Sequence, residues 1–168
     1  MAQRYEEAPP QTLDAEHTYS AIIHLDGGDV SIRLLPELAP RTVNSFVFLA
    51  REGLYDGTTF HRVIADFIAQ GGDPTGTGSG GPGYRVPDEL SDRSFGPGAV
   101  GMANPGPDSN GSQFFITLDA ASHLDGRFTL FGEVIAGIDI VRSLSPRSGD
   151  DPSAPPGDRI NSIEVVAG

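Results

Sequence analysis

The chain has 168 residues, a length that fits one domain with a single core. Its 23 acidic residues outnumber 11 basic ones and give a formal net charge of −12, which disfavours binding to nucleic acid or to an acidic membrane surface. Cysteine and lysine are absent, so disulfides, thiolate nucleophiles, cysteine-ligated metals and Schiff-base chemistry are excluded.

The first 17 residues are polar and acidic and include Pro9 and Pro10, a composition typical of a flexible arm. We expect this arm, residues 1–17, to precede a folded domain over residues 18–168. The arm has no apolar segment of the signal-peptide kind, and no later apolar run approaches the roughly 18 residues that span a bilayer. The sequence therefore predicts a soluble, cytoplasmic protein without a membrane partner.

The folded part begins with a predicted β-hairpin and a helix. Residues 19–24 and 30–34 are apolar runs that flank the turn sequence Asp-Gly-Gly-Asp, as in a hairpin. After Pro36, apolar residues at helical spacing predict one amphipathic helix, and Gly53 is its stop signal.

The rest of the chain consists of short strand patterns between loops rich in Gly, Pro, Asn and Asp. The predicted strands are 58–64, 66–70, 99–103, 113–117, 129–135 and a last one over 160–167, with a glycine-rich loop over 71–83 and a short helix over 138–144. No internal repeat or heptad pattern is present. Seven or eight strands with two helices indicate a mainly β fold, a closed antiparallel barrel.

The glycine-rich loop fits the spacing of a dinucleotide fingerprint at Gly76, Gly78 and Gly81, but Pro82 and further loop sequence follow instead of a helix. Nucleotide binding is therefore disfavoured. The four histidines lie too far apart in the sequence for a short metal motif, and no pair of acids interrupts an apolar strand in the manner of a hydrolase. The sequence predicts no metal and no cofactor.

Polar side chains inside apolar strands are the more informative signal. Arg62 lies within the apolar stretch Phe-His-Arg-Val-Ile, where an unpaired guanidinium would be costly to bury. Either it extends to water or it faces a cleft. Alternation places Ile68 beside Gln70, and Gln113 beside Phe115, so two strands each present an amide and an apolar group on one face.

Three motifs give the chain a family resemblance. YDGTTFHRVIADFIAQGG over residues 55–72, GMANPGPDSNGSQFFIT over 101–117 and HLDGRFTLFGEV over 123–134 resemble, in order and spacing, the signatures of the cyclophilins. This family comprises cyclosporin-binding peptidyl-prolyl cis/trans isomerases. The resemblance extends over about residues 19–167 and implies a closed eight-stranded antiparallel β-barrel capped by two α-helices, with the active groove on its outer surface.

The resemblance also assigns expected roles to individual residues. Arg62 matches the catalytic arginine, which would face a bound X-Pro bond. Gln70 and Phe115 are expected to complete the catalytic group. The expected substrate-binding residues are Phe67, Ile68 and Leu124 in the proline pocket, Ala103, Asn104 and Gln113 along the peptide backbone, and His123 and Phe128 at two further groove positions.

The chain departs from the family pattern at several of these positions. His123 stands where many members have Trp, Phe128 where many have His, and Ile68 where Met is common. None of these changes removes the donor or the pocket, but we expect weak cyclosporin binding.

The resemblance thus implies a monomeric isomerase that acts on proline-containing peptides and unfolded protein clients and assists protein folding. The alternative from another class is a module that binds proline segments without turnover. A barrel hydrolase would require two carboxylates in one cleft, and Arg62 with the amides is expected to occupy it instead.

Overall fold

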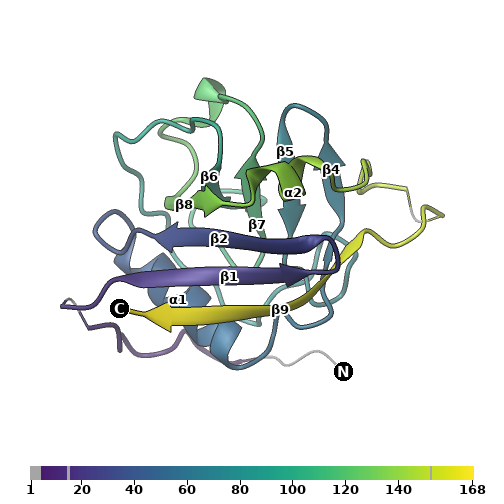
Figure 1. Cartoon of the computed structure of the whole chain (residues 1–168). Coiled ribbons are helices and arrows are strands. Elements are labelled where there is room, and N and C mark those ends of the chain that lie inside the picture. The colour runs from purple at the N-terminus through teal and green to yellow at the C-terminus, as the bar shows by residue number, and fades with distance from the viewer. Residues whose placement is uncertain (1–4, 15, 152) are drawn as a thin grey trace.

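The computed structural model describes residues 5–14, 16–151 and 153–168. Its sheet is antiparallel and follows the order β3-β9-β1-β2-β8-β6-β7-β5-β4 (Figure 1). The strands are β1 (Tyr19–Leu25), β2 (Gly28–Leu34), β3 (Thr59–Phe60), β4 (Arg62–Ile64), β5 (Ile68–Gly71), β6 (Ala99–Met102), β7 (Phe114–Thr117), β8 (Leu130–Ala136) and β9 (Asp158–Ala167). The helices are α1 (Pro40–Arg51), the 3₁₀ turn η1 (Ser122–Leu124) and α2 (Ile138–Arg142).

The two end strands of this order, β3 and β4, follow one another in the chain with only His61 between them. The sheet therefore curls into a nearly closed barrel, which confirms the predicted fold class. The structure has nine strands in its described part, whereas eight were expected, because His61 divides the predicted strand 58–64. Its first half pairs with β9 and its second half with β5, a division that the sequence pattern does not reveal.

The predicted hairpin and helix are confirmed. β1 and β2 pair from Ser20–Arg33 to Leu25–Gly28, and α1 begins with Pro40 in its first turn, where a missing N–H costs nothing. The helix buries Val43, Phe46 and Val47. In Figure 1 it lies behind β1 and β9.

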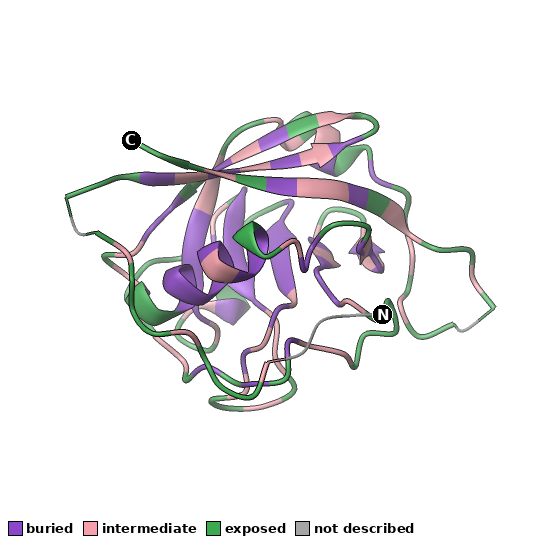
Figure 2. Ribbon diagram, turned by 90° about the horizontal axis from the view of Figure 1, so that it is seen from below, coloured by how far each residue is buried: buried purple, intermediate pink, exposed green. Residues whose placement is uncertain are grey.

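The interior divides into two apolar clusters, and Figure 2 shows the buried residues concentrated on α1 and on the strands. The larger fills the barrel and includes Phe46, Phe60, Phe114 and Phe131, which lie in ring contact or close to one another. The smaller contains Phe115 together with Ile68, Phe95, Leu124 and Leu130. Consecutive residues Phe114 and Phe115 thus point to opposite faces of β7, as strand alternation requires.

The expected arm, residues 1–17, lies partly outside the described residues. Its described part contacts the barrel: the Thr12 backbone N–H donates to Asn44 Oδ1 over 3.0 Å, and the Asn44 amide donates to the Pro10 carbonyl over 3.1 Å. The division of the chain at residue 17, and the flexibility of the arm, stay predictions. No helix within the described residues is both long and apolar enough to cross a bilayer.

Candidate active site

A groove of about 900 Å³ lies on the outer surface of the barrel, over β4, β5 and β7. Every residue that the sequence assigned to the site lines it: Arg62, Phe67, Ile68, Gln70, Ala103, Asn104, Gln113, Phe115, His123, Leu124 and Phe128. The first sequence motif ends at residue 72 and the second begins at residue 101, and the antiparallel pairing of β5 with β7 brings them together. The roles of these residues stay predictions.

Strand register places the central polar residues. Arg62 on β4 lies directly opposite Gln70 on β5, and Gln70 lies opposite Phe115 on β7. Residues opposite one another on antiparallel strands point to the same face. The barrel thereby fixes Arg62, Gln70 and Phe115 in one row across the groove.

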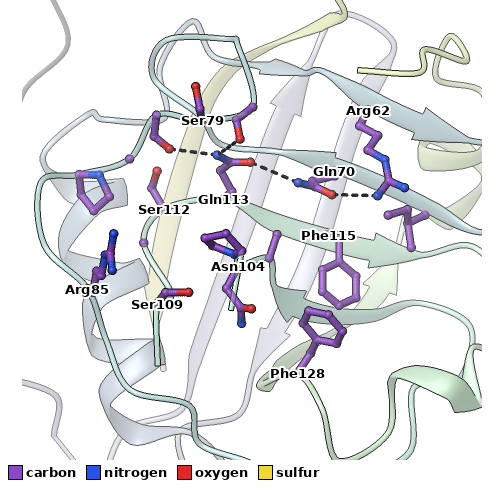
Figure 3. A pocket seen from close by; sticks show the side chains of 18 of the residues that line it. Arg62, Gln70, Ser79, Arg85, Asn104, Ser109, Ser112, Gln113, Phe115 and Phe128 are labelled. Atoms are coloured by element: carbon purple, nitrogen blue, oxygen red, sulfur yellow. Dashed lines mark hydrogen bonds between the residues drawn. The ribbon is translucent and has the colours of Figure 1, made fainter. Parts of the chain in front are cut away.

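A chain of hydrogen bonds connects the polar side chains (Figure 3). Arg62 Nη1 donates to Gln70 Oε1 over 3.4 Å, and Gln70 Nε2 donates to Gln113 Oε1 over 3.2 Å. Gln113 Nε2 then donates to the carbonyls of Gly78 and Gly80, each over 3.0 Å. Each amide side chain is oriented by the next one in this series, and Gln70 in turn holds the Arg62 guanidinium at the groove. Gln70 engages only one of the five N–H donors of the guanidinium.

Asp73 anchors the far end of this chain of hydrogen bonds. Its side chain is buried and accepts hydrogen bonds from the backbone N–H groups of Thr75, Gly78 and Gly80. Burial alone would raise the pKa of the Asp73 carboxyl, but the hydrogen bonds outweigh burial and lower it. The charged carboxylate therefore fixes the loop whose carbonyls orient Gln113.

The apolar part of the groove is built around Phe115. Its ring stacks on Phe95 with centroids 5.5 Å apart and meets the edge of Phe128 at 5.8 Å. A Cβ on Gly101 would lie 2.6 Å from the tip of the Phe115 ring, so the position leaves room only for glycine. Phe67, Ile68 and Leu124 pack against the same cluster. The result is a shallow apolar pocket beside the Arg62 guanidinium.

His123 lies at the rim of the groove. It is exposed in η1, and its ring lies over Phe67 with centroids 5.4 Å apart. His61, by contrast, lies beneath the groove: it is buried, and its burial lowers the pKa of the imidazole. His61 does not line the groove.

One wall of the groove is not indicated by the sequence motifs. Residues 78–85 line it together with Pro105, Ser109, Gly111 and Ser112. The glycine-rich loop was assessed only as a nucleotide motif, and Arg85 lies outside the three signature motifs. No local pattern indicates that this loop folds over the groove; the Gln113 hydrogen bonds that hold it there arise only in the folded barrel.

Comparison with known proteins agrees with this geometry. The family model described as cyclophilin type peptidyl-prolyl cis-trans isomerase/CLD matches residues 20–165. Peptidyl-prolyl cis-trans isomerase B of Bacillus subtilis is 48% identical over 71% of this chain and 85% of its own length. The peptidyl-prolyl cis-trans isomerase of Synechococcus elongatus is 43% identical over 87% of this chain and 95% of its own length.

Solved structures show the same fold. The crystal structure of a cyclophilin type peptidyl-prolyl cis-trans isomerase of Cryptosporidium parvum superposes with a TM-score of 0.81 at 31% identity, covering 90% of this chain and 99% of that one. A second crystal structure of that protein, obtained in the presence of the dipeptide Ala-Pro, superposes with a TM-score of 0.79 over 89% of this chain and 99% of that one, also at 31% identity.

Proposed function

The chain belongs to the cyclophilin-type peptidyl-prolyl cis-trans isomerases, and we propose that it binds an X-Pro segment in this groove with Arg62 as the catalytic donor. Its reaction is rotation about the peptide bond that precedes proline. The observation that carries the assignment of roles is the row formed by Arg62, Gln70 and Phe115, which places an oriented cation beside an apolar pocket.

The chemistry explains why a cation is useful here. A peptide bond resists rotation because the nitrogen lone pair is delocalised into the carbonyl, which gives a barrier of roughly 18–20 kcal/mol. In the twisted transition state the proline nitrogen becomes pyramidal and regains its lone pair. A donor aimed at that nitrogen therefore stabilises the transition state more than either planar ground state.

Arg62 suits this role because a guanidinium stays charged throughout the physiological pH range. Gln70 holds it in place, and the Phe115 pocket holds the proline ring. No covalent bond is made or broken, so the reaction requires neither a nucleophile nor a proton transfer. An acceleration of several decades requires roughly 5–8 kcal/mol of differential stabilisation, which one charged hydrogen bond and good orientation can supply together.

We propose that the substrates are proline-containing peptides and unfolded protein clients, whose backbone Ala103, Asn104 and Gln113 bind. Support comes from the position of these residues in the groove and from the relative whose structure was obtained with Ala-Pro. A role in protein folding follows from this substrate class, because uncatalysed X-Pro exchange takes tens to hundreds of seconds and can limit folding.

Exchange spectroscopy by NMR on an Ala-Pro peptide, without a coupled protease, tests the assigned roles. Catalytic amounts of the protein should produce cis/trans exchange. Phe115→Ala should raise KM at least about fivefold, whereas Gln70→Ala should lower kcat because Arg62 loses its orienting partner. Peptide binding without accelerated exchange would instead favour a binding module, and two folded variants with wild-type constants would overturn the assigned roles.

A further inference from the structure

The groove lining has a charge balance opposite to that of the chain. Acidic residues outnumber arginines by 23 to 11 in the whole sequence. Among the described residues that line the groove, Arg62 and Arg85 are charged, and none is Asp or Glu. A groove lined by one sign of charge concentrates its potential and favours ligands of the opposite sign.

Two carboxylates near the lining, Asp73 and Asp88, accept hydrogen bonds from the protein itself. Asp73 lies buried below the glycine-rich loop and accepts hydrogen bonds from it. Asp88 accepts hydrogen bonds from the Asn110 amide over 3.0 Å and from the Asp108 backbone N–H over 3.1 Å. Both carboxylates accept hydrogen bonds from the protein's own loops, and neither lines the groove.

Arg85 has a fixed backbone and an unengaged side chain. The preceding residue, Tyr84, is buried and hydrogen-bonded to Ser45 over 2.6 Å. The following residue, Val86, exchanges backbone hydrogen bonds with Asn110. Arg85 itself is exposed, and within the described part of the chain it forms neither an ion pair nor a side-chain hydrogen bond. Its guanidinium is therefore available to a ligand.

The two arginines stand at different ends of the groove. Figure 3 shows Arg62 near Gln70 and Phe115, and Arg85 at the opposite side of the view, beyond Asn104 and Ser112. A peptide whose proline occupies the Phe115 pocket and whose chain follows the groove toward Arg85 would place a residue outside the X-Pro bond beside it. Arg85 thus faces the segment that flanks the X-Pro bond and takes no part in the rotation itself.

We infer that this isomerase prefers proline segments that carry an Asp or Glu side chain in the residues flanking the X-Pro bond, and that Arg85 binds that carboxylate. The inference rests on the proposed position of proline at Phe115. A guanidinium recognises a carboxylate through two parallel hydrogen bonds, which gives the contact geometric selectivity. Because Arg85 is exposed, the preference is about two- to fivefold in KM.

Matched Ala-Pro peptides test this preference. Each pair differs only by Glu or Gln, placed at successive positions on either side of the X-Pro bond, and KM is measured by exchange NMR. At one flank the Glu peptide should have a KM about two- to fivefold lower than the Gln peptide, and added salt should reduce this ratio.

Arg85→Gln should bring the Glu/Gln ratio close to one. Arg51→Gln removes the same charge from an exposed position at the end of α1, away from the groove, and should keep the ratio of the wild type. A ratio of one at every position in the wild type, or a ratio that survives in Arg85→Gln, would overturn the inference. These results differ from those expected if the proposed isomerase function itself were wrong, because in that case neither the Glu nor the Gln peptides would show accelerated exchange.

Discussion

Arg62, the proposed catalytic donor, is flanked by a loop segment that lies outside strands β4 and β5. Arg147 exchanges backbone hydrogen bonds with Val63 at 2.8 and 2.9 Å, and its Nη1 donates to the His61 carbonyl over 2.7 Å. Gly149 lies against the Arg62 stem: a Cβ at this glycine would be 3.0 Å from Arg62 Cβ. The loop after α2 therefore fixes the backbone on both sides of Arg62 and limits where its side chain can lie.

Gly149→Ala should lower kcat/KM about three- to tenfold, because the added methyl displaces the Arg62 stem and small misplacements of a catalytic group are costly. Gly57→Ala is the matched control. Both glycines have a similar positive φ, +85° and +80°, but a Cβ at Gly57 would meet only Arg159, at 3.7 Å. Exchange NMR should show reduced turnover in Gly149→Ala but not in Gly57→Ala. Equal kcat/KM in the two variants would contradict the claim that Gly149 helps to position Arg62.

His123→Trp should tighten cyclosporin binding by about tenfold or more, roughly 1.4 kcal/mol, while kcat/KM changes only a few fold. Imidazole at the groove rim offers less apolar area than an indole, and cyclosporin is a broad apolar ligand. In the proposed mechanism, turnover depends on Arg62 and on the apolar pocket around Phe115. Titration of both proteins in the exchange assay measures the two effects, and equal dissociation constants would show that Phe115 and Leu124 already supply the contact.

The sequence predicts groove-lining residues where the signal is local and misses them where it depends on tertiary contacts, and the roles of all of them stay predictions. Arg62, Gln70 and Gln113 are polar residues inside apolar strands, so alternation and motif both indicate them. Gly149 and Arg85 lie in loops with ordinary loop composition. Gly149 lies against Arg62, and Arg85 lies at the groove wall. Both positions result from contacts between segments distant in the sequence, which hydrophobic periodicity does not reveal.

At the scale of elements, the N-terminal segment contacts helix α1 and the wall of the groove. The Tyr5 ring meets Phe48 edge-on at 5.1 Å and Tyr84 at 6.4 Å, and the Tyr5 backbone N–H donates to the Pro82 carbonyl over 2.7 Å. Pro82 and Tyr84 themselves line the groove. Composition alone indicated a flexible arm, since single aromatic contacts of this kind leave no periodic signal.

Deletion of residues 1–13 should lower the melting temperature by about 4–8 °C, because it removes the edge-on ring contacts and the hydrogen bonds to Asn44, together worth about 2 kcal/mol. KM for an Ala-Pro peptide should rise, since Pro82 and Tyr84 lose their support. Tyr5→Phe keeps the ring packing and serves as the control. An unchanged melting temperature would show that the segment is flexible and independent of the barrel.

The sequence predicts which segments form strands and helices better than it predicts which strands pair with one another. The hairpin of β1 and β2 and the helix α1 agree with expectation because their apolar spacing and turn residues are local signals. The predicted strand 58–64 divides at His61 because its two halves find different partners, β9 and β5. Pairings between distant segments depend on closure of the barrel.

At the scale of the whole molecule, two histidines make opposite contributions to the pH dependence of stability. Burial lowers the pKa of His61 below its ordinary value of 6.5, so this residue contributes stability above pH 6.5 that is lost as pH falls through its lower folded pKa. Hydrogen bonds that the His24 ring donates to the Glu164 and Asp29 carboxylates raise the pKa of His24, so its contribution is complete below pH 6.5 and is lost as pH rises through its higher folded pKa.

The melting temperature should therefore fall as pH decreases from about 6.5 to 5, because His61 loses its contribution in this range while the contribution of His24 is already complete. His24→Gln should leave this fall nearly unchanged and should instead remove the loss of stability that His24 causes as pH rises above 6.5. Turnover of the folded protein should stay nearly flat from about pH 6 to 9, since a guanidinium donor stays charged throughout this range. Melting curves and exchange rates across this range check both statements, and a steep pH profile of kcat would show that another group carries the reaction.

The central claim is that the Arg62 guanidinium lowers the rotational barrier of a bound X-Pro bond, and Arg62→Ala tests it most directly. Cis/trans exchange of an Ala-Pro peptide and the melting temperature are measured on the same protein preparation. Without the donor, kcat/KM should fall at least about tenfold, or 1.4 kcal/mol, and the melting temperature should stay close to that of the wild type. Near wild-type exchange in a folded Arg62→Ala protein would contradict the mechanism.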